Sequence, residues 1–418
     1  MMRLWFLNHH AIPGRGSGGT RHAVLAKYLQ RRGHEITIFA ADVPHAGGKA
    51  LAGPARGDSA NPYTHEVIEG VTWRFVRVRP YHNAIERLLS MRSYRTNVGR
   101  STDELPLPDV IVGSCVHPYA VDAALQLAHR LQVPFVYEIR DVWPESLADV
   151  GVLPRWNPVY WHFRQLELRA FRHADGVVGV CPGMQRYAIQ NGVPADRFLY
   201  LPNGIDPELH AEARPSPQTD TPTITYLGSQ GPVNDLATLV EAAAMLQHRG
   251  PLAPRIRLIG DGTERPRLEQ QAARLGLHNL EFLAPVPKAQ VAAVCQASDA
   301  FVYCHRYMPV VAKYGVSANK IFDYLAAARP VVFSCTSWND PVREAEAGIS
   351  VPAGQPVELA AAIAQICGLS AEQRWRLGCN GRRHVLAHHN LASLSEKLES
   401  FLDSIAAPRQ TNARRCAA

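Results

Sequence analysis

Glycines close to the N-terminus form the first pattern in this sequence that could do chemistry. Gly14, Gly16 and Gly19 spell G-x-G-x-x-G between an apolar run that predicts a strand and a segment that predicts a helix. Backbone N–H groups at such a helix start bind phosphate, and Asp42, at the end of the next predicted strand, would complete a dinucleotide site. Residues 8–14 separate the predicted strand from the first glycine, which fits a nicotinamide site poorly. We therefore expect the loop to contact a different anion, with a purely structural loop as the alternative.

Polar side chains end two predicted strands of the first half. Residues 134–141 predict a strand that ends in Arg140 and Asp141, with Glu145 shortly after, and His117 ends the preceding predicted strand. Polar residues at the carboxyl ends of parallel strands face the ligand crevice of such sheets. We expect these side chains to open into the same crevice as the glycine loop, where a histidine can hydrogen-bond a sugar hydroxyl or a phosphate oxygen. The alternatives are a solvated loop and a turn histidine.

A third group lies in the second half, in residues 314–332. Asn319 and Lys320 stand at the predicted start of a helix, and Asp323 follows one turn later. Residues at i and i+3 share a helix face, and a helix start that points at a crevice favours anions. Lysine there can neutralise a diphosphate, and the carboxylate can hold ribose hydroxyls. The alternative is a surface ion pair, which contributes at most ~1 kcal/mol.

The elements that must position these groups alternate along the chain. Apolar runs separated by amphipathic helices predict βαβ units and parallel sheets, and this rhythm restarts after a stretch rich in proline, threonine and acids. The sequence therefore predicts an α/β protein with two doubly wound, Rossmann-like domains facing a central cleft, closed by C-terminal helices. The predicted parts are a domain over 1–205, a linker over 206–222, a domain over 223–385, and a closing helix and tail over 386–418.

Composition limits the class of protein. With 418 residues, 46% apolar and 19% charged, the chain is globular, and its net charge of +7 lies mostly in the first half, which favours an anionic partner there. The eight cysteines contain no C-x-x-C pair and sit largely in apolar runs, which is typical of reduced thiols in a cytoplasmic protein. No apolar run approaches the ~20 residues that span a membrane, so we expect a soluble or peripheral protein.

A basic stretch from Arg74 to Arg100 holds seven arginines against one glutamate. Its apolar positions are Ile85, Leu88, Leu89 and Tyr94. A basic amphipathic segment of this kind can bind an anionic bilayer surface, and the alternative is a helix packed on the core with a solvated basic face. Aromatic residues do not interleave with the arginines, so we expect no nucleic-acid partner.

Together with the segments GSGGTRH, RDVWPES, LPNGID and LIGDGTERPRLE, residues 314–332 resemble the retaining glycosyltransferases of family 4, which have the GT-B fold. The likeness runs from Leu4 to Ser404 and is greatest to the branch that builds bacterial O-antigen, capsule and colanic-acid-type polysaccharides. It implies transfer of a sugar from a nucleoside-diphosphate sugar, most often UDP-linked, to a polyprenyl-diphosphate-linked glycan. No metal or other cofactor is implied. The enzyme would work in the cytoplasm, peripheral to the inner face of the cytoplasmic membrane.

The resemblance also assigns residues. Asp323 matches the second acid of the family's E-x7-E motif, which holds the ribose, and Lys320 matches a basic residue that some members place against the diphosphate. The base would meet backbone groups at Val286. The loop glycines that approach the diphosphate correspond to Gly18 and Gly19.

On the side of the reacting sugar, His117 matches a histidine near that sugar, and we predict His117 and Asp141 as catalytic. Arg140 and Glu145 would face the acceptor. Retention without a second carboxylate suits a front-face displacement in which the leaving phosphate takes the acceptor's proton.

Two departures from the family pattern stand out. The first acid of E-x7-E falls at Gly315, so Ser317 and Asn319 would supply the hydrogen bonds of that missing carboxylate. The loop GSQGPVND lacks the arginine and lysine that many members place against the diphosphate. Lys320 would then carry more of that role, helped by Arg306 or Lys313. A nucleotide-sugar epimerase on the same fold, or a non-catalytic scaffold protein, are the alternative functions.

Overall fold

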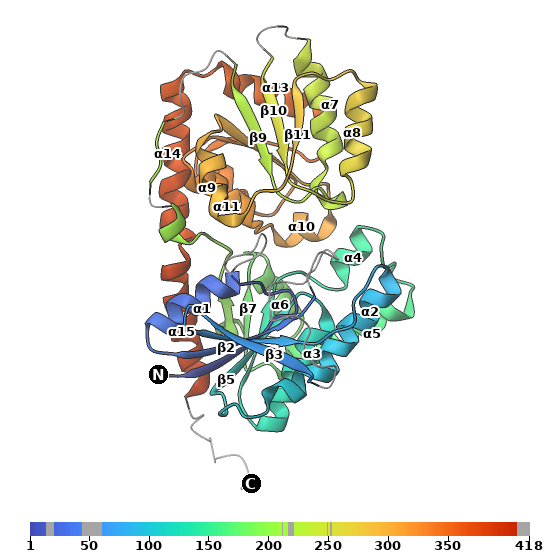
Figure 1. Ribbon diagram of the computed structural model, residues 1–418, viewed down its shortest axis with the longest axis vertical. Coiled ribbons are helices and arrows are strands. Elements are labelled where there is room, and N and C mark those ends of the chain that lie inside the picture. Colours follow the sequence, from blue (N-terminus) through green and yellow to red (C-terminus); the bar gives the residue numbers. More distant parts are fainter. Residues whose placement is uncertain are drawn as a thin grey trace.

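The computed structural model describes residues 1–13, 21–43, 61–210, 212–215, 221–248, 250 and 253–407. These residues form two α/β domains stacked along the long axis of the molecule (Figure 1). The predicted glycines Gly14, Gly16, Gly18 and Gly19 lie outside the described residues.

The N-terminal domain is built on a sheet of eight described strands in the order β3-β4-β2-β1-β5-β6-β7-β8. Only β3 runs antiparallel to its neighbour among these pairs. The strands are β1 (Arg3–Leu7), β2 (Glu35–Ala41), β3 (Tyr63–Ile68), β4 (Val71–Val76), β5 (Val110–Cys115), β6 (Phe135–Ile139), β7 (Gly176–Gly179) and β8 (Phe198–Tyr200). The chain order reverses between β1 and β5, so the switch point of the sheet lies there.

Helices cover both faces of this sheet. They are α1 (Arg21–Arg31), α2 (Ala84–Val98), α3 (Pro118–Leu131), α4 (Glu145–Asp149), α5 (Pro158–His173) and α6 (Met184–Gln190), with short 3-10 turns at Gly99–Thr102 and Ala195–Arg197. Two of the starts follow from local chemistry. His117 and Asn157 cap α3 and α5, each with proline at the first helical position, where the missing N–H costs nothing.

The C-terminal domain has a smaller parallel sheet in the order β11-β10-β9-β12-β13-β14, with its switch point between β9 and β12. Its strands are β9 (Thr223–Leu227), β10 (Arg255–Ile259), β11 (Leu280–Leu283), β12 (Ala300–Cys304), β13 (Val331–Ser334) and β14 (Gly348–Val351). Its helices are α7 (Leu236–Gln247), α8 (Arg265–Arg274), α9 (Lys288–Gln296), α10 (Pro309–Tyr314), α11 (Asn319–Ala326), α12 (Pro341–Glu344), α13 (Pro356–Gly368) and α14 (Ala371–His388), with 3-10 turns at Pro207–His210 (η3) and Pro232–Asn234 (η4).

The chain crosses between the domains twice, and the two crossings lie side by side. Ile205 on the outward crossing forms a bridge to Asn390 on the return, and its N–H donates to the carbonyl of His389 (2.9 Å). After the return, α15 (Leu391–Ala406) packs against α1 and contributes four buried leucines to the N-terminal core. Figure 1 shows α14 and α15 following one another along the side of both domains. The predicted boundary between residues 385 and 386 falls inside α14.

The basic stretch that begins at Arg74 is only partly the surface feature that the sequence suggests. Arg74 lies in β4, buried, with its guanidinium 4.4 Å from the ring centre of Tyr63. Tyr94 is fully buried and its hydroxyl donates to the carbonyl of Phe39 (2.8 Å), so it belongs to the core and not to an exposed stripe. Ile85 and Leu89 of α2 are exposed.

Candidate active site

The carboxyl ends of both sheets meet at the junction of the domains. Asp149, at the end of α4, accepts a hydrogen bond from the N–H of Val310 at the start of α10 (2.7 Å). The N–H of Gly183, after β7, donates to the carbonyl of Tyr314 (3.0 Å). The loops that follow the strands of one domain therefore contact those of the other, as the two-domain prediction requires.

Lys320 lies in the first turn of α11 and reaches the loop that follows β9. Its ammonium donates to the hydroxyl of Tyr226 (2.6 Å) and to Oδ1 of Asn234 (2.9 Å). It also passes so close to Gly228 that a Cβ there would lie 2.8 Å from the lysine Cε. Burial lowers the pKa of Lys320 to about 7. Both described acceptors are neutral, so this partly buried cation is suited to an anionic ligand.

Asp323, one turn further along α11, has a different described partner from those of Lys320. Its Oδ1 accepts a hydrogen bond from Nε2 of His210 in the linker (3.2 Å). Together with Asn319, both residues line a small cavity of about 20 Å³ beside the crossing. The alternative of a Lys320–Asp323 ion pair is therefore not what the described contacts show.

Ser317 binds the crossing between the domains. Its hydroxyl accepts from the N–H of Asn203 (3.0 Å), and its carbonyl accepts from the Asn203 side-chain amide (2.5 Å). Val286 lies between β11 and α9 and packs against the core cluster that contains Phe322 of α11. Ser317 and Lys320 flank the start of α11, and the roles of Ser317, Val286 and Lys320 toward a ligand stay predictions.

Gly315 occupies the position of the missing acid because its surroundings demand glycine. Its φ of +102° lies in the region that L side chains rarely adopt, and an added Cβ would lie 2.5 Å from Oδ1 of Asn339. That side chain is fixed, because Oδ1 accepts from the N–H of Val316 (2.8 Å) and Nδ2 donates to its carbonyl (3.0 Å). The amide of Asn339 therefore fills the space beside this backbone position.

The substitution Gly315→Glu, which restores the first acid of the E-x7-E motif, is expected to destabilise the folded protein. The substitution combines a strained backbone with a clash against Asn339, so we expect a loss of about 1–3 kcal/mol in the free energy of unfolding. Denaturant unfolding measures this, with Gly250→Glu as the control, since that glycine also has a positive φ but no atom lies within 4 Å of the point where its Cβ would stand. Equal losses for the two variants would contradict the role of Asn339.

His117 is fully buried at the switch point of the N-terminal sheet. Its Nδ1 accepts from the N–H of Ala120 (3.2 Å), so Nε2 carries the proton and donates to Nδ1 of His9 (2.7 Å). The ring of His9 lies 4.8 Å from that of Tyr94 and 4.6 Å from that of His10. Sequence reasoning missed His9 and His10, although their place directly after β1 at the switch point was the available signal.

Arg140 and Asp141 follow β6 at the junction. Asp141 is exposed, yet desolvation raises the pKa of its carboxyl while Arg140 opposes that shift. Desolvation by neighbouring protein therefore disfavours the charged form of this carboxyl, and its role toward a ligand stays a prediction.

Glu145 at the start of α4 makes its described contacts within the N-terminal domain. It accepts from Arg155 (2.7 Å) and from the hydroxyl of Tyr160 (2.5 Å). Burial opposes the charge, but these two hydrogen bonds keep the pKa of Glu145 below its usual value. The carboxylate thus anchors α4 to α5, and a direct contact with an acceptor stays a prediction.

A buried charge network joins β6 to α1, and sequence reasoning did not assign it. Glu138 of β6 accepts from Nε of Arg21 (3.1 Å) and pairs with Nε2 of His22 (2.7 Å). His22 and Arg21 hold the pKa of Glu138 well below its usual range despite burial. Arg21 also donates to the carbonyls of Leu201 (2.8 Å) and Pro202 (2.5 Å) and thereby fixes the crossing. Segments far apart in the chain meet here, which no local pattern reveals.

Arg306 and Lys313 were expected to help Lys320, and both are exposed. The N–H of Arg306 donates to the carbonyl of Val233 (2.9 Å), which joins the loop after β12 to the loop after β9. The carbonyl of Lys313 accepts from Arg186 of α6 (2.7 Å). Their backbones thus support the junction, and their side chains stay candidates.

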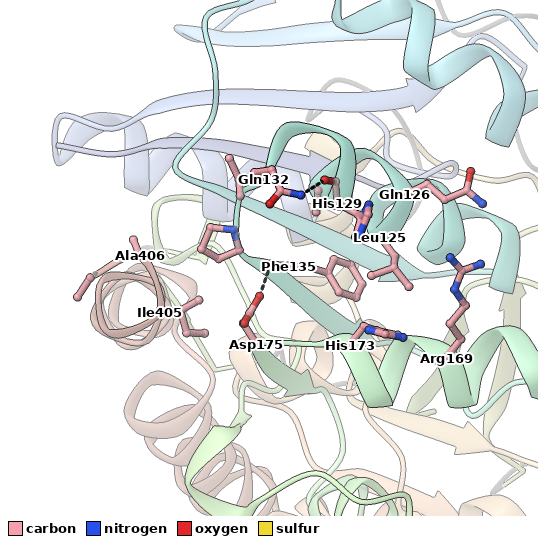
Figure 2. Close-up of a pocket in the computed structure, with 14 residues that line it drawn as sticks. Leu125, Gln126, His129, Gln132, Phe135, Arg169, His173, Asp175, Ile405 and Ala406 are labelled. Carbon is pink, nitrogen blue, oxygen red and sulfur yellow. Dashed lines mark hydrogen bonds between the residues drawn. The ribbon is translucent and has the colours of Figure 1, made fainter. Parts of the chain in front are cut away.

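A pocket of about 580 Å³ lies at the opposite end of the N-terminal sheet. Figure 2 shows Arg169 and His173 on one side of it and Ile405 and Ala406 of α15 on the other. Apart from the end of α15, its lining comes from α3, from the segment that leads into β6, and from α5 and Asp175 before β7, at the amino ends of the strands. No predicted site residue lines it, so it is not the candidate active site.

Two other kinds of site are absent from the described ranges. No cluster of three or more histidine, cysteine, aspartate or glutamate side chains there could hold a metal ion. No helix in the same ranges is long and apolar enough to cross a membrane.

Comparisons with known proteins match nearly the whole chain. A family described as "Glycosyl transferase 4-like domain" matches residues 16–204, and one described as "Glycosyl transferases group 1" matches residues 221–368. A protein of Escherichia coli K12 named as a colanic acid biosynthesis glycosyl transferase, WcaI, is 23% identical over 345 residues, which is 76% of this chain and 79% of that protein.

Solved structures share the architecture. Sucrose-phosphate synthase from Thermosynechococcus elongatus is 18% identical with a TM-score of 0.75, over 97% of this chain and 99% of that one. HepE of Anabaena, solved in complex with UDP-glucose, is 17% identical with a TM-score of 0.66, over 97% of this chain and all (100%) of that one. At such low identity these likenesses bear on the fold alone, and they confirm the prediction of two doubly wound domains with closing helices.

Proposed function

The chain belongs to glycosyltransferase family 4 and has the GT-B fold, and on that premise we propose that it transfers a sugar from a UDP-sugar to a lipid-linked oligosaccharide in bacterial surface polysaccharide biosynthesis. The single observation that carries the proposal is Lys320. It is a partly buried cation whose described partners are both neutral, at a helix start beside the switch point of the C-terminal sheet. This is the position at which such sheets bind phosphates.

The proposed donor, a UDP-sugar, is supported by residues of the C-terminal domain and by a solved structure with the same fold. Asp323, near the linker, offers a carboxylate for ribose hydroxyls, and Val286 offers backbone groups to a base, while Lys320 faces the diphosphate. HepE, which shares the fold, was solved with UDP-glucose. The proposed role in polysaccharide biosynthesis is supported by WcaI, whose name places it in colanic acid biosynthesis.

The proposed chemistry is a retaining, front-face displacement. The bond between the anomeric carbon and the diphosphate oxygen breaks, and its electron pair stays on the leaving UDP. An acceptor hydroxyl oxygen bonds to the same face of that carbon and passes its proton to the leaving phosphate. Lys320 stabilises the negative charge that grows on the diphosphate, and stabilisation of developing charge by fixed groups usually contributes most to the acceleration of such reactions. Closing the domains around the reacting groups excludes water and limits hydrolysis.

We also propose that the exposed face of α2 contacts an anionic membrane, where a lipid-linked acceptor lies. Replacing both Ile85 and Leu89 by aspartate is expected to lower binding to phosphatidylglycerol vesicles several-fold, because two apolar contacts become repelled charges. Co-sedimentation at low and high salt measures this, with neutral vesicles for comparison. Val67→Asp is the control, since that exposed valine lies on edge strand β3. If vesicle binding is unchanged in the double variant and is the same at low and high salt, the proposed membrane contact is contradicted.

The test of the proposed function is to incubate the protein with a panel of UDP-sugars, with and without a polyprenyl-linked acceptor, and to measure UDP release. Acceptor-dependent release of UDP and a lengthened glycan are expected. Conversion of the nucleotide sugar without an acceptor would favour the epimerase. A thermal-shift series with UDP, GDP and NAD completes the test, because a bound ligand raises stability by RT ln(1 + [L]/Kd). No response to any nucleotide would favour the scaffold.

A further inference from the structure

We propose that His210 of the interdomain linker is a positioning residue for the donor nucleotide, because it holds the Asp323 carboxylate in the orientation that binds the ribose. This inference rests on the proposed function and deepens it. It adds a specificity element that lies outside both Rossmann-like domains, in the segment that joins them.

The first observation is the pair itself. Nε2 of His210 lies 3.2 Å from Oδ1 of Asp323, and the histidine side chain is only 5% exposed against 13% for the aspartate. Both side chains are thus largely buried, and the aspartate is the more accessible of the two. One carboxylate oxygen is engaged by the imidazole, so the orientation of the other is fixed as well, because the two oxygens share a plane.

The second observation is that His210 is fixed at its backbone. Arg382 of α14 donates to the carbonyl of His210 (2.7 Å) and to the carbonyl of Ala326 (2.6 Å), the last residue of α11. One guanidinium thus ties the end of η3 to the helix that carries Asp323. The distance between the imidazole and the carboxylate is therefore set by α11 and α14 and not by a free linker.

The beginning of η3 is tied to the other domain. Asp206, which precedes the turn, accepts from Lys27 (2.5 Å) and from the hydroxyl of Tyr28 (2.8 Å), both on α1. It also accepts from the N–H of Glu208 (3.1 Å). A four-residue turn held at both ends presents its last side chain in one direction, toward α11.

The chemistry of the pair defines the ligand group. A carboxylate accepts hydrogen bonds, and two adjacent hydroxyls of a ribose donate them, whereas a deoxyribose has only one. A site built to bind a substrate hydroxyl rejects the analogue without it strongly, since the buried acceptor is then unsatisfied. The His210–Asp323 pair should therefore make the protein bind UDP more tightly than it binds the deoxy analogues of UDP.

The experiment measures the affinities of UDP, 2′-deoxy-UDP and 3′-deoxy-UDP by calorimetry. We expect the wild-type protein to prefer UDP over at least one analogue by about tenfold or more, as for hydrogen bonds to charged groups. His210→Ala should reduce that preference to about threefold or less while UDP still binds. His210→Gln should retain it, because the glutamine amide can donate from the place of Nε2.

A matched control separates positioning from stability. His34 forms a similar pair, with Nε2 2.7 Å from Oε1 of Glu399, between the turn that precedes β2 and α15 and within the N-terminal domain. His34→Ala should lower the melting temperature and leave the preference among the three nucleotides unchanged.

The possible results of these titrations distinguish the role of His210 from the proposed function. If the wild-type protein binds UDP with the expected preference and His210→Ala keeps it, the role of His210 is refuted and the proposed function stands. If His210→Ala weakens all three nucleotides equally, the residue is merely structural. If the wild-type protein binds none of them, the proposed function is overturned together with this inference.

Discussion

Replacing Lys320 by methionine is expected to weaken UDP binding by at least about thirtyfold, because removing one partner of a buried, hydrogen-bonded charge pair costs about 2–5 kcal/mol. Methionine keeps the length of the side chain and its contact with Gly228, so the loss reports the ammonium. Calorimetric titration with UDP measures it. Lys397→Met is the control, since that exposed lysine lies on α15, which packs against the N-terminal domain. Unchanged affinity in the Lys320 variant would remove the residue from the diphosphate site.

The same ammonium should make UDP binding depend on pH. Burial lowers the pKa of Lys320 to about 7, so the amine is increasingly neutral in the free protein above that pH. A bound diphosphate favours the charged form and raises the pKa of the amine, so binding takes up a proton between about pH 7 and pH 9. Affinity should therefore fall as pH rises through this range. Calorimetry in buffers of different ionisation enthalpy detects the proton, and Lys320→Met should lack it.

Arg21→Met is expected to be the most destabilising single change, lowering the free energy of unfolding by about 3–5 kcal/mol. It leaves Glu138 buried with His22 as its remaining described ion-pair partner, and it leaves the carbonyls of Leu201 and Pro202 without their donor. Urea unfolding followed by tryptophan fluorescence measures the loss.

The control for that experiment is an exposed pair. Arg3 forms a 2.7 Å ion pair with Glu35 in which both side chains remain about one-third or more exposed (32% and 47%). Arg3→Met should cost less than about 1 kcal/mol by loss of that pair. Comparable losses for the two variants would contradict the importance of burial at Arg21.

The order of the elements was readable from the sequence because most of them carry strong local signals. Residues 110–115 and 300–304, for example, form wholly buried strands, and their apolar sequences predict this. Strand β3 was missed because YTHEVI is half polar, as expected for an edge strand with one wet face. Helix α10 was missed because six residues are too few to show a helical period.

The site was only partly readable for a different reason. Lys320 could be placed because it sits inside a contiguous motif at a helix start. The partners of Asp323, Glu138 and Ser317 come from residues more than a hundred positions away, so no local spacing encodes them. Tyr94 looked like part of a surface stripe because periodicity shows which residues share a face and not which way that face points.

Because the chain returns to its N-terminal domain, the way in which domains can be exchanged between related proteins is restricted. Topologically, the C-terminal domain is an insertion within the N-terminal domain, entered near residue 205 and left near residue 390. A hybrid spliced at one point would combine an α15 from one relative with an α1 from the other, so two splice points are required. During synthesis, likewise, the N-terminal domain cannot complete its core until α15 has left the ribosome, although most of that domain is translated first.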